Sequence, residues 1–351
     1  MEASFVPYNN DQARMVIDAR QRFSALVDAR RRRDGYRGSM TWVERGGAEY
    51  LIRSLYPEGG SARRQKSLGL RSPETEALKR EFEVGRAEAE ARVVNLEDGV
   101  ARMAAVVESL GLGRVPSLSA RILRMLDDAG LLGRKLRLVG TNALFAYEAI
   151  AAANFDPGLT TTEDMDLLFH AGAGLRFTAQ EELSRESLIA LLRRVDRSFG
   201  RAGATFRAVN RDGFYVDLIK PEPRPPWRPE PEGVSSDVDD LVASGIEGLF
   251  WLQNAPTVET VAFDQKGVPV RLVACDPRAF AVHKLWLSGR LYRDPAKRQR
   301  DAGQARAVAE IVATRLLHLP FEAEALRMMP RELVEAAAPL FAAHKPPKLE
   351  W

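Results

Sequence analysis

The stretch LRLVGTNALFAYEAIAAANFDPGLTTTEDMDLLF, residues 136–169, decides which fold is predicted for this chain. It opens with a short apolar strand, passes through a glycine into an apolar helical segment at 142–153, and ends in a second apolar strand at 164–169. Three further segments follow: RESLIALLRRVDRSF (185–199), ATFRAV (204–209) and FYVDLIK (214–220). Strands and helices in this order predict an α/β (α+β) fold with a small mixed sheet flanked by helices.

The chain before this sheet is predicted to be an accessory region, residues 1–132. Short strands separated by glycine pairs predict a β-meander over 39–70. Ser72 and Pro73 then open a long charged helix over 73–110, with the serine as N-cap and the proline in the first turn. The sequence therefore places a meander and a long helix before the sheet.

Basic and aromatic residues gather in this accessory region. An amphipathic helix expected over 12–33 ends in four arginines, residues 30–33. The meander holds Trp42, Tyr50, Tyr56, Arg63, Arg64 and Lys66. Basic groups beside aromatic rings suit a nucleic-acid backbone with stacked bases. The alternative, which we favour, is that the aromatics form the core of the meander and the arginines a solvated helix end.

The catalytic core is expected over residues 133–220, and residues 221–351 are expected to form a linker, a hairpin and a helical C-terminal domain. The linker PEPRPPWRPEPE (221–232) is too rich in proline for a helix or a central strand. A hairpin over 258–274 and the helix PRAFAVHKLWLSGRL (277–291) follow it.

The composition of the chain limits the classes of function that we expect. The 351 residues include 48 acidic and 51 basic side chains, so a net charge of +3 does not by itself indicate a nucleic-acid binder. The single cysteine, Cys275, excludes an internal disulfide, and four scattered histidines do not suggest a zinc site. Neither a signal sequence nor a run of about 18 apolar residues is evident, so we expect a cytoplasmic protein without a membrane segment.

Three aspartates stand where chemistry is expected. Alternate side chains of a strand share a face, so Asp164 and Asp166 are aligned roughly 7 Å apart along the backbone. Asp217 is the only acid in the apolar strand 214–220, where a charge needs a partner or a metal. Magnesium prefers hard oxygen ligands and bridges carboxylates to substrate phosphates. The three acids therefore predict a site for Mg²⁺ or Mn²⁺ and a nucleoside triphosphate.

A phosphate contact is expected at the turn before the first helix. Gly140 and Thr141 lie where the strand LRLV meets that helix, so backbone N–H groups, the Thr141 hydroxyl and the helix N-terminus can meet a phosphate. Glycine permits the close approach of the ligand to the backbone.

The elements LVGTNAL, EDMDLLF and YVDLI together resemble the signature of the nucleotidyltransferase superfamily related to DNA polymerase β. More closely, the chain resembles bacterial nucleotidyltransferase-fold proteins with a GTNAL-type turn after a basic hairpin and a long helix. The resemblance implies that Asp164 and Asp166 bind both metal ions and that Asp217 helps to bind the ion that activates the acceptor hydroxyl.

The same resemblance implies the nucleotide contacts. Gly140 and Thr141 would hold triphosphate oxygens, and Asn142 is a further candidate. Lys284 is included because PRAFAVHKLWLSGRLYRD is similar to the helix after the sheet in toxin-like nucleotidyltransferases, although an exposed lysine on an amphipathic helix is an equal alternative. Two features depart from the family: threonine replaces the usual serine at position 141, and the loop before Asp164 is longer.

The sequence thus predicts a metal-dependent enzyme that moves a nucleoside monophosphate from an NTP such as ATP to a hydroxyl. RNA or tRNA, a protein or a small molecule are the possible acceptors, and the oligomeric state is open. The alternative is a non-catalytic nucleotide- or nucleic-acid-binding scaffold of the same fold. No P-loop or protein-kinase signature favours phosphoryl transfer. His170 and His283 are expected to be packed or solvated rather than catalytic.

Overall fold

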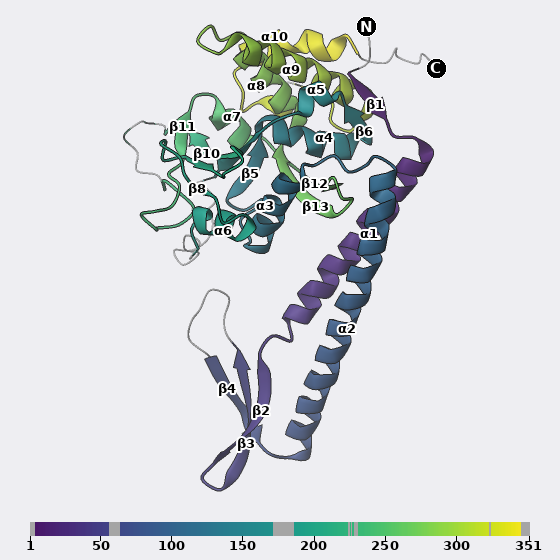
Figure 1. Cartoon of the computed structure of the whole chain (residues 1–351), viewed down its shortest axis with the longest axis vertical. Helices are drawn as coiled ribbons and strands as arrows, with labels where there is room; N and C mark the ends of the chain where they lie inside the picture. The colour runs from purple at the N-terminus through teal and green to yellow at the C-terminus, as the bar shows by residue number, and fades with distance from the viewer. Residues whose placement is uncertain are drawn as a thin grey trace. The chain divides into compact units, whose positions relative to one another are not determined.

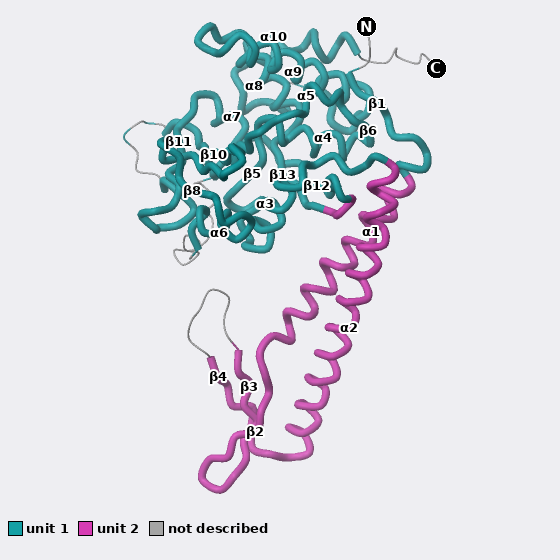
Figure 2. Tube along the Cα trace, in the orientation of Figure 1, with its two compact units in different colours: residues 1–13, 111–266, 270–351 teal, residues 14–110, 267–269 magenta. Residues whose placement is uncertain are grey.

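The structure of the chain, a computed structural model, describes residues 4–55, 64–170, 186–223, 225, 227, 231–322 and 324–344. The chain divides into two compact units (Figure 2): unit 1 comprises residues 1–13, 111–266 and 270–351, and unit 2 comprises residues 14–110 and 267–269. Figure 1 shows their helices and strands. The mixture of helices with strands in several sheets confirms the predicted α/β class. Tyr56 and Arg63 lie outside the described residues.

Unit 2 combines two long helices with a three-stranded sheet. Helices α1 (Asn10–Asp34) and α2 (Pro73–Ser109) pack together through a small apolar cluster that includes Leu26, Ala29 and Val93. Strands β2 (Ser39–Arg45), β3 (Ala48–Leu55) and β4 (Arg64–Leu70) form an antiparallel meander in that order. Ser72 and Thr75 form a capping box at the start of α2. The three strands lie within residues 39–70, and α2 begins directly after its N-cap Ser72.

Two aromatic side chains of unit 2, Trp42 and Phe82, contact arginines of the same unit. The guanidinium of Arg71 lies 5.1 Å from the ring centre of Trp42, and that of Arg53 lies 4.0 Å from the ring centre of Phe82. The two basic residues of β4 are exposed. These contacts agree with packing as the role of Trp42, while the exposed basic groups stay available to an acidic partner.

Unit 1 is built on an eight-stranded mixed sheet. Its strands are β5 (Leu136–Val139), β7 (Asp164–Phe169), β8 (Gly200–Arg201), β9 (Arg207–Val209), β10 (Tyr215–Pro221), β11 (Ser244–Ile246), β12 (Thr257–Phe263) and β13 (Pro269–Cys275). They follow the order β12-β13-β5-β7-β10-β9-β8, and β11 also pairs with β10. The expected hairpin, β12 and β13, extends the sheet beside β5. A small two-stranded sheet joins β1 (Phe5–Pro7) to β6 (Ala153–Phe155).

Helices surround this sheet (Figure 1). They are α3 (Ser117–Asp128), α4 (Leu144–Ala151), α5 (Pro157–Thr160), α6 (Leu188–Val195), α7 (Leu249–Asn254), α8 (Pro277–Ser288), α9 (Pro295–Arg315) and α10 (Arg331–Ala342), with short 3-10 turns η1 (Gly140–Ala143) and η3 (Glu324–Leu326). Among the described residues, no helix is long and apolar enough to cross a membrane.

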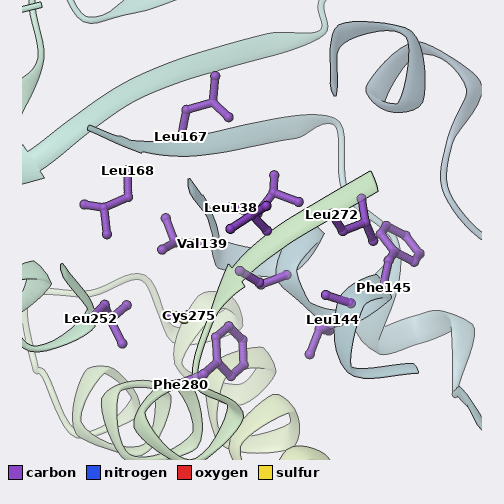
Figure 3. Close-up of a cluster of buried hydrophobic side chains, with 14 of the residues drawn as sticks. Leu138, Val139, Leu144, Phe145, Leu167, Leu168, Leu252, Leu272, Cys275 and Phe280 are labelled. Carbon is purple, nitrogen blue, oxygen red and sulfur yellow. The ribbon is translucent and has the colours of Figure 1, made fainter. Parts of the chain in front are cut away.

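The core of unit 1 fixes the strands that carry the acids. Leu138 of β5 is paired with Leu167 of β7, and both are fully buried. Figure 3 shows them gathered with Leu272 of β13 and Phe280 of α8. Full burial of one such side chain contributes about 1.5–3 kcal/mol, so the strands are held firmly in register.

Several elements are shorter than the sequence predicts, among them α4, α6, α8 and β9. Helix α6 ends at Val195, not at residue 199, because the Asp196 carboxylate accepts hydrogen bonds from the backbone N–H and hydroxyl of Ser198. Strand β9 begins at Arg207, not at residue 204. Side-chain hydrogen bonds of this kind end a helix without any change in its apolar pattern.

Candidate active site

Strand pairing forms a row of four residues across the sheet. Parallel pairing of β7 with β10 sets Asp166 opposite Asp217. Antiparallel pairing sets Val139 of β5 opposite Asp166 and Arg207 of β9 opposite Asp217. Because directly opposed residues of adjacent strands share a face of the sheet, all four side chains project from one side.

Asp164 joins this acidic face from one step along β7. It lies two residues before Asp166 and is opposite Tyr215 of β10. The Thr162 hydroxyl donates a hydrogen bond to Asp164 Oδ1 and so orients the carboxylate. The structure therefore brings the three aspartates of the sequence prediction together on one face.

The three carboxylates line a cavity of about 330 Å³ in unit 1. Its polar lining is Thr141, Asp164, Asp166, Arg207, Asp217, His283, Lys284, Arg293, Lys297 and Arg300. Its apolar lining is Val139, Phe206, Ile219, Ile246, Leu249, Leu252, Phe280 and Leu287. The sheet thus contributes the three acids and Arg207, α8 and α9 contribute bases, and Arg293 comes from the connection between these two helices.

The acids repel one another. Burial, together with the nearby charges of Asp164 and Asp217, raises the pKa of Asp166 to about 6, although Lys284 and Arg293 act in the opposite direction. A carboxylate held this close to two others is stabilised in its charged form by any added cation.

The turn after β5 is shaped around Asp166. Gly140 has a φ of 62°, and a Cβ there would overlap Asp166 Oδ2, so the backbone touches the carboxylate only because this residue is glycine. The Thr141 hydroxyl accepts a 3.3 Å hydrogen bond from Gln304 Nε2 of α9. The GTNAL-type turn is therefore linked to both the acid strand and α9.

Asn142 has a different position from the one that a nucleotide contact needs. Its Nδ2 donates a 2.7 Å hydrogen bond to the carbonyl oxygen of Asp164, and its side chain is buried. It is not among the described residues that line the cavity. Its contact holds the start of β7 against the turn, so it positions Asp164.

Asp217 is bound by an arginine. Arg207 Nε and Nη2 donate to Asp217 Oδ1 and Oδ2 at 2.7 and 2.6 Å, a two-pronged ion pair. The hydrogen bonds that Arg207 donates to Asp217 raise the pKa of Arg207. The guanidinium lies 4.7 Å from the ring centre of Tyr215, a cation–π distance. The third acid therefore carries its own counter-charge.

The opposite wall has a second buried ion cluster. Lys284 Nζ donates to Asp301 Oδ1 at 2.7 Å, and Arg293 Nε donates to Asp301 Oδ2. Burial lowers the pKa of Lys284, which Asp301 partly offsets. Burial acts to raise the pKa of Asp301, but Lys284 and Arg293 outweigh it and lower that pKa. The predicted Lys284 thus lines the cavity, buried rather than exposed.

Two basic residues that the sequence did not single out face the same cavity. Lys297 and Arg300 share a face of α9 with Gln304 because they are spaced three and four residues apart. Within the described part of the chain, neither has an ion-pair partner. The only sequence signal was the basic run AKRQR after Pro295, which is typical of many solvated helices.

His283 is packed, as the sequence suggested. Its ring lies 5.6 Å from that of Trp286 and 6.3 Å from that of Trp251. Burial and the neighbouring Lys284 lower its pKa to about 3. The imidazole is therefore neutral at physiological pH, and its buried Nε2 has no hydrogen-bond partner among the described residues.

A divalent ion fits part of the acid cluster. Within the described ranges, no group of three or more His, Cys, Asp or Glu side chains is arranged to hold a metal. Asp164 and Asp166 nevertheless offer hard oxygen ligands at the cavity wall, where burial and the neighbouring carboxylates raise the pKa of Asp166. Asp217 has both oxygens engaged by Arg207. The carboxylates of Asp164 and Asp166 therefore suit a divalent ion, whereas the carboxylate of Asp217 is occupied by Arg207.

Comparison with known proteins agrees with this site. The sequence model of a family described as nucleotidyltransferase matches residues 117–330. That range contains the glycine turn, the three aspartates and the basic residues of α8 and α9 that line the cavity. No curated protein and no solved structure is significantly similar to the chain.

Proposed function

The chain belongs to this nucleotidyltransferase family, and from that premise we propose that it transfers a nucleoside monophosphate from an NTP to a hydroxyl acceptor with the help of a divalent metal ion. One observation carries the proposal. Three carboxylates on one face of the sheet stand across a single cavity from the basic residues of α8 and α9. A triphosphate with its metal ion has the complementary arrangement of charges, a cation for the acids next to a chain of negative oxygens for the bases.

The metal would be held by the sheet. Asp164 and Asp166 are its proposed ligands, and Asp217 would complete the set. Mg²⁺ is the natural choice for carboxylate oxygens and phosphates, and Mn²⁺ accepts the same ligands. When bound, such an ion neutralises phosphate charge and lowers the pKa of a hydroxyl.

The triphosphate would be held by the basic wall and the glycine turn. Lys297 and Arg300 have no ion-pair partner in the described part of the chain, so their charges are available to the β- and γ-phosphates. The backbone at Gly140 and Thr141 would contact phosphate oxygens from the other side. Lys284 and Arg293 add positive potential while they stay bound to Asp301.

The apolar lining suits the base of the nucleotide. Leu249 and Leu252 of α7 and Phe280 of α8 line the same cavity as the acids and the basic residues. A planar base packed there would fix the α-phosphate near the acids, where an incoming hydroxyl must approach. Positioning of reactants in this way lowers the entropic part of the barrier.

The test is transfer of label from each α-³²P NTP in Mg²⁺ or Mn²⁺, with total cellular RNA and total protein as acceptors. The wild-type protein is expected to label one acceptor class. The double variant Asp164→Asn/Asp166→Asn should transfer at least about a thousandfold less, equivalent to about 4 kcal/mol of lost transition-state stabilisation.

The matched control is Asp212→Asn, which removes an exposed carboxylate from the turn before β10 and lies outside the cavity lining. It should label the acceptor as the wild type does. Equal labelling by the wild type and the double variant would refute the assignment of the acids.

RNA is the first acceptor to test. Residues 30–70 hold ten basic and four acidic residues, and those on β4 are exposed. If this region binds RNA, its affinity should fall steeply as the salt concentration rises. Labelled protein in place of labelled RNA would redirect the acceptor assignment and leave nucleotidyl transfer intact.

The second candidate function is a non-catalytic nucleotide-binding scaffold. The ion pair of Arg207 with Asp217 favours it, because a carboxylate that stays bound to arginine does not ligate a metal. Retained NTP binding with no transfer under any of the conditions above would support this alternative.

A further inference from the structure

The pair of Arg207 and Asp217 is unequal in mobility. Asp217 lies on β10 with neighbours on both sides, and its side chain is 9% exposed. Arg207 begins the three-residue strand β9, next to the two-residue β8 at the edge of the sheet, and its side chain is 36% exposed. When the pair separates, the arginine is therefore the partner that moves.

The guanidinium of Arg207 also has aromatic rings beside it that it can contact after it leaves Asp217. It lies over the ring of Tyr215, and at 5.5 Å from the ring centre of Phe206, which lines the cavity. Stacking on these rings leaves the N–H groups free to meet phosphate oxygens in the cavity. Arg207 can release Asp217 and remain beside the site.

No other base in the described residues forms an ion pair with the three acids. Lys284 and Arg293 are both bound to Asp301. Arg207 is thus the internal cation of the acidic face, and it occupies the same two oxygens that a divalent ion would need from Asp217.

We propose that Arg207 is a positioning residue that keeps Asp217 occupied until a divalent cation displaces it, after which its guanidinium turns to the phosphates of the NTP. The proposal rests on the metal-dependent function above. It predicts that metal binds the free protein through Asp164 and Asp166 against competition from an arginine for the third ligand.

The test measures Mn²⁺ binding to the full chain without nucleotide, by the electron paramagnetic resonance signal of free Mn²⁺. Arg207→Met keeps an unbranched apolar side chain beside Tyr215 but removes the guanidinium and so frees Asp217. Because an exposed or half-buried ion pair is typically worth up to about 1 kcal/mol, Mn²⁺ should bind roughly two- to fivefold more tightly to this variant.

Two further proteins separate displacement from a general charge effect. Lys297→Met removes one positive charge from the same cavity without freeing a carboxylate, so its Mn²⁺ affinity should change by less than that of Arg207→Met. In an Asp217→Asn background, Arg207→Met should give no gain, because the ligand that it would release is absent.

The outcomes are distinct. Equal Mn²⁺ affinity of the wild type and Arg207→Met, with binding abolished by Asp164→Asn/Asp166→Asn, overturns the role of Arg207 and leaves the metal site standing. A gain that persists in the Asp217→Asn background also overturns it. No Mn²⁺ binding by any of the proteins overturns both the displacement and the metal-dependent function. Circular dichroism confirms that each variant is folded.

Discussion

The two charged walls of the cavity differ in how their charges are balanced. On the sheet wall, three aspartates face one arginine. On the helix wall, Lys284 and Arg293 already neutralise Asp301 and leave a positive excess, to which Lys297 and Arg300 add. The sheet wall has an excess of negative charge and the helix wall an excess of positive charge. A ligand that carries a cation at one end and several anions at the other therefore neutralises both.

The two walls also differ in what holds their charged side chains in place. On the helix wall, the buried carboxylate of Asp301 binds Lys284 and Arg293 and so holds both side chains in place. The sheet wall fixes its acids through the backbone, since strand pairing sets their positions without any cation. The sheet wall can therefore exchange its cation. Loss of Asp301 from the helix wall would instead leave a buried positive charge without a partner.

The largest effect is expected at Asp301. Asp301→Asn leaves the buried Lys284 without a full counter-charge and should lower the free energy of unfolding by about 3 kcal/mol. Urea denaturation followed by circular dichroism measures it. Glu335→Gln breaks the exposed pair with Arg331 and should change the value by no more than about 0.5 kcal/mol. Equal effects of the two variants would mean that the helix wall is not held by its acid.

A pH titration examines the sheet wall. The pKa of Asp166 is about 6 in the folded chain, against an ordinary value of 3.8, so the folded state holds this proton more tightly than the unfolded state does. That stabilisation is complete below pH 4 and is lost as the pH rises through 6. Between pH 4 and 7, with a chelator present, the free energy of unfolding of the wild type should fall by about 2 kcal/mol relative to Asp166→Asn. Parallel curves would show that neither burial nor the neighbouring acids raise the pKa of Asp166.

The smallest effect concerns a single base on the helix wall. Lys297→Gln removes a cavity charge that has no ion-pair partner in the described residues, so it should weaken binding of a non-hydrolysable NTP analogue by roughly fivefold, or about 1 kcal/mol. Isothermal titration calorimetry measures the change. Arg211→Gln, an exposed arginine of the turn before β10, serves as the control and should leave affinity unchanged. Loss of affinity in both variants would indicate a general charge effect.

The acids were predictable because they depend on local pattern. The two-residue period of a strand puts Asp164 and Asp166 on one face, and a lone acid in an apolar strand marks Asp217. The glycine of the turn was predictable for the same reason, since a positive φ is needed where a strand turns sharply into a helix. The divisions expected at residues 132 and 220 stay predictions.

The partners of these residues were not predictable, because they depend on register and packing. Arg207 is an ordinary residue in ATFRAV, and only the pairing of β9 with β10 sets it opposite Asp217. Lys284 left two alternatives open, and its burial against Asp301, seventeen residues away, excludes the exposed one. The long loop before Asp164 is ordered by contacts with α9, where Gln304 donates to the Leu159 carbonyl.

The pairing of β7 with β10 has a consequence for how related chains are recognised. Asp166 and Asp217 are neighbours because their parallel strands are joined by backbone hydrogen bonds. The distance between the two acids therefore does not depend on the number of residues that connects them in the chain. Insertions or deletions anywhere in that connection leave the pair intact, whereas a shift of one residue within either strand turns an acid to the opposite face. A search pattern for such proteins must keep the spacing inside each strand fixed and let the interval between them vary.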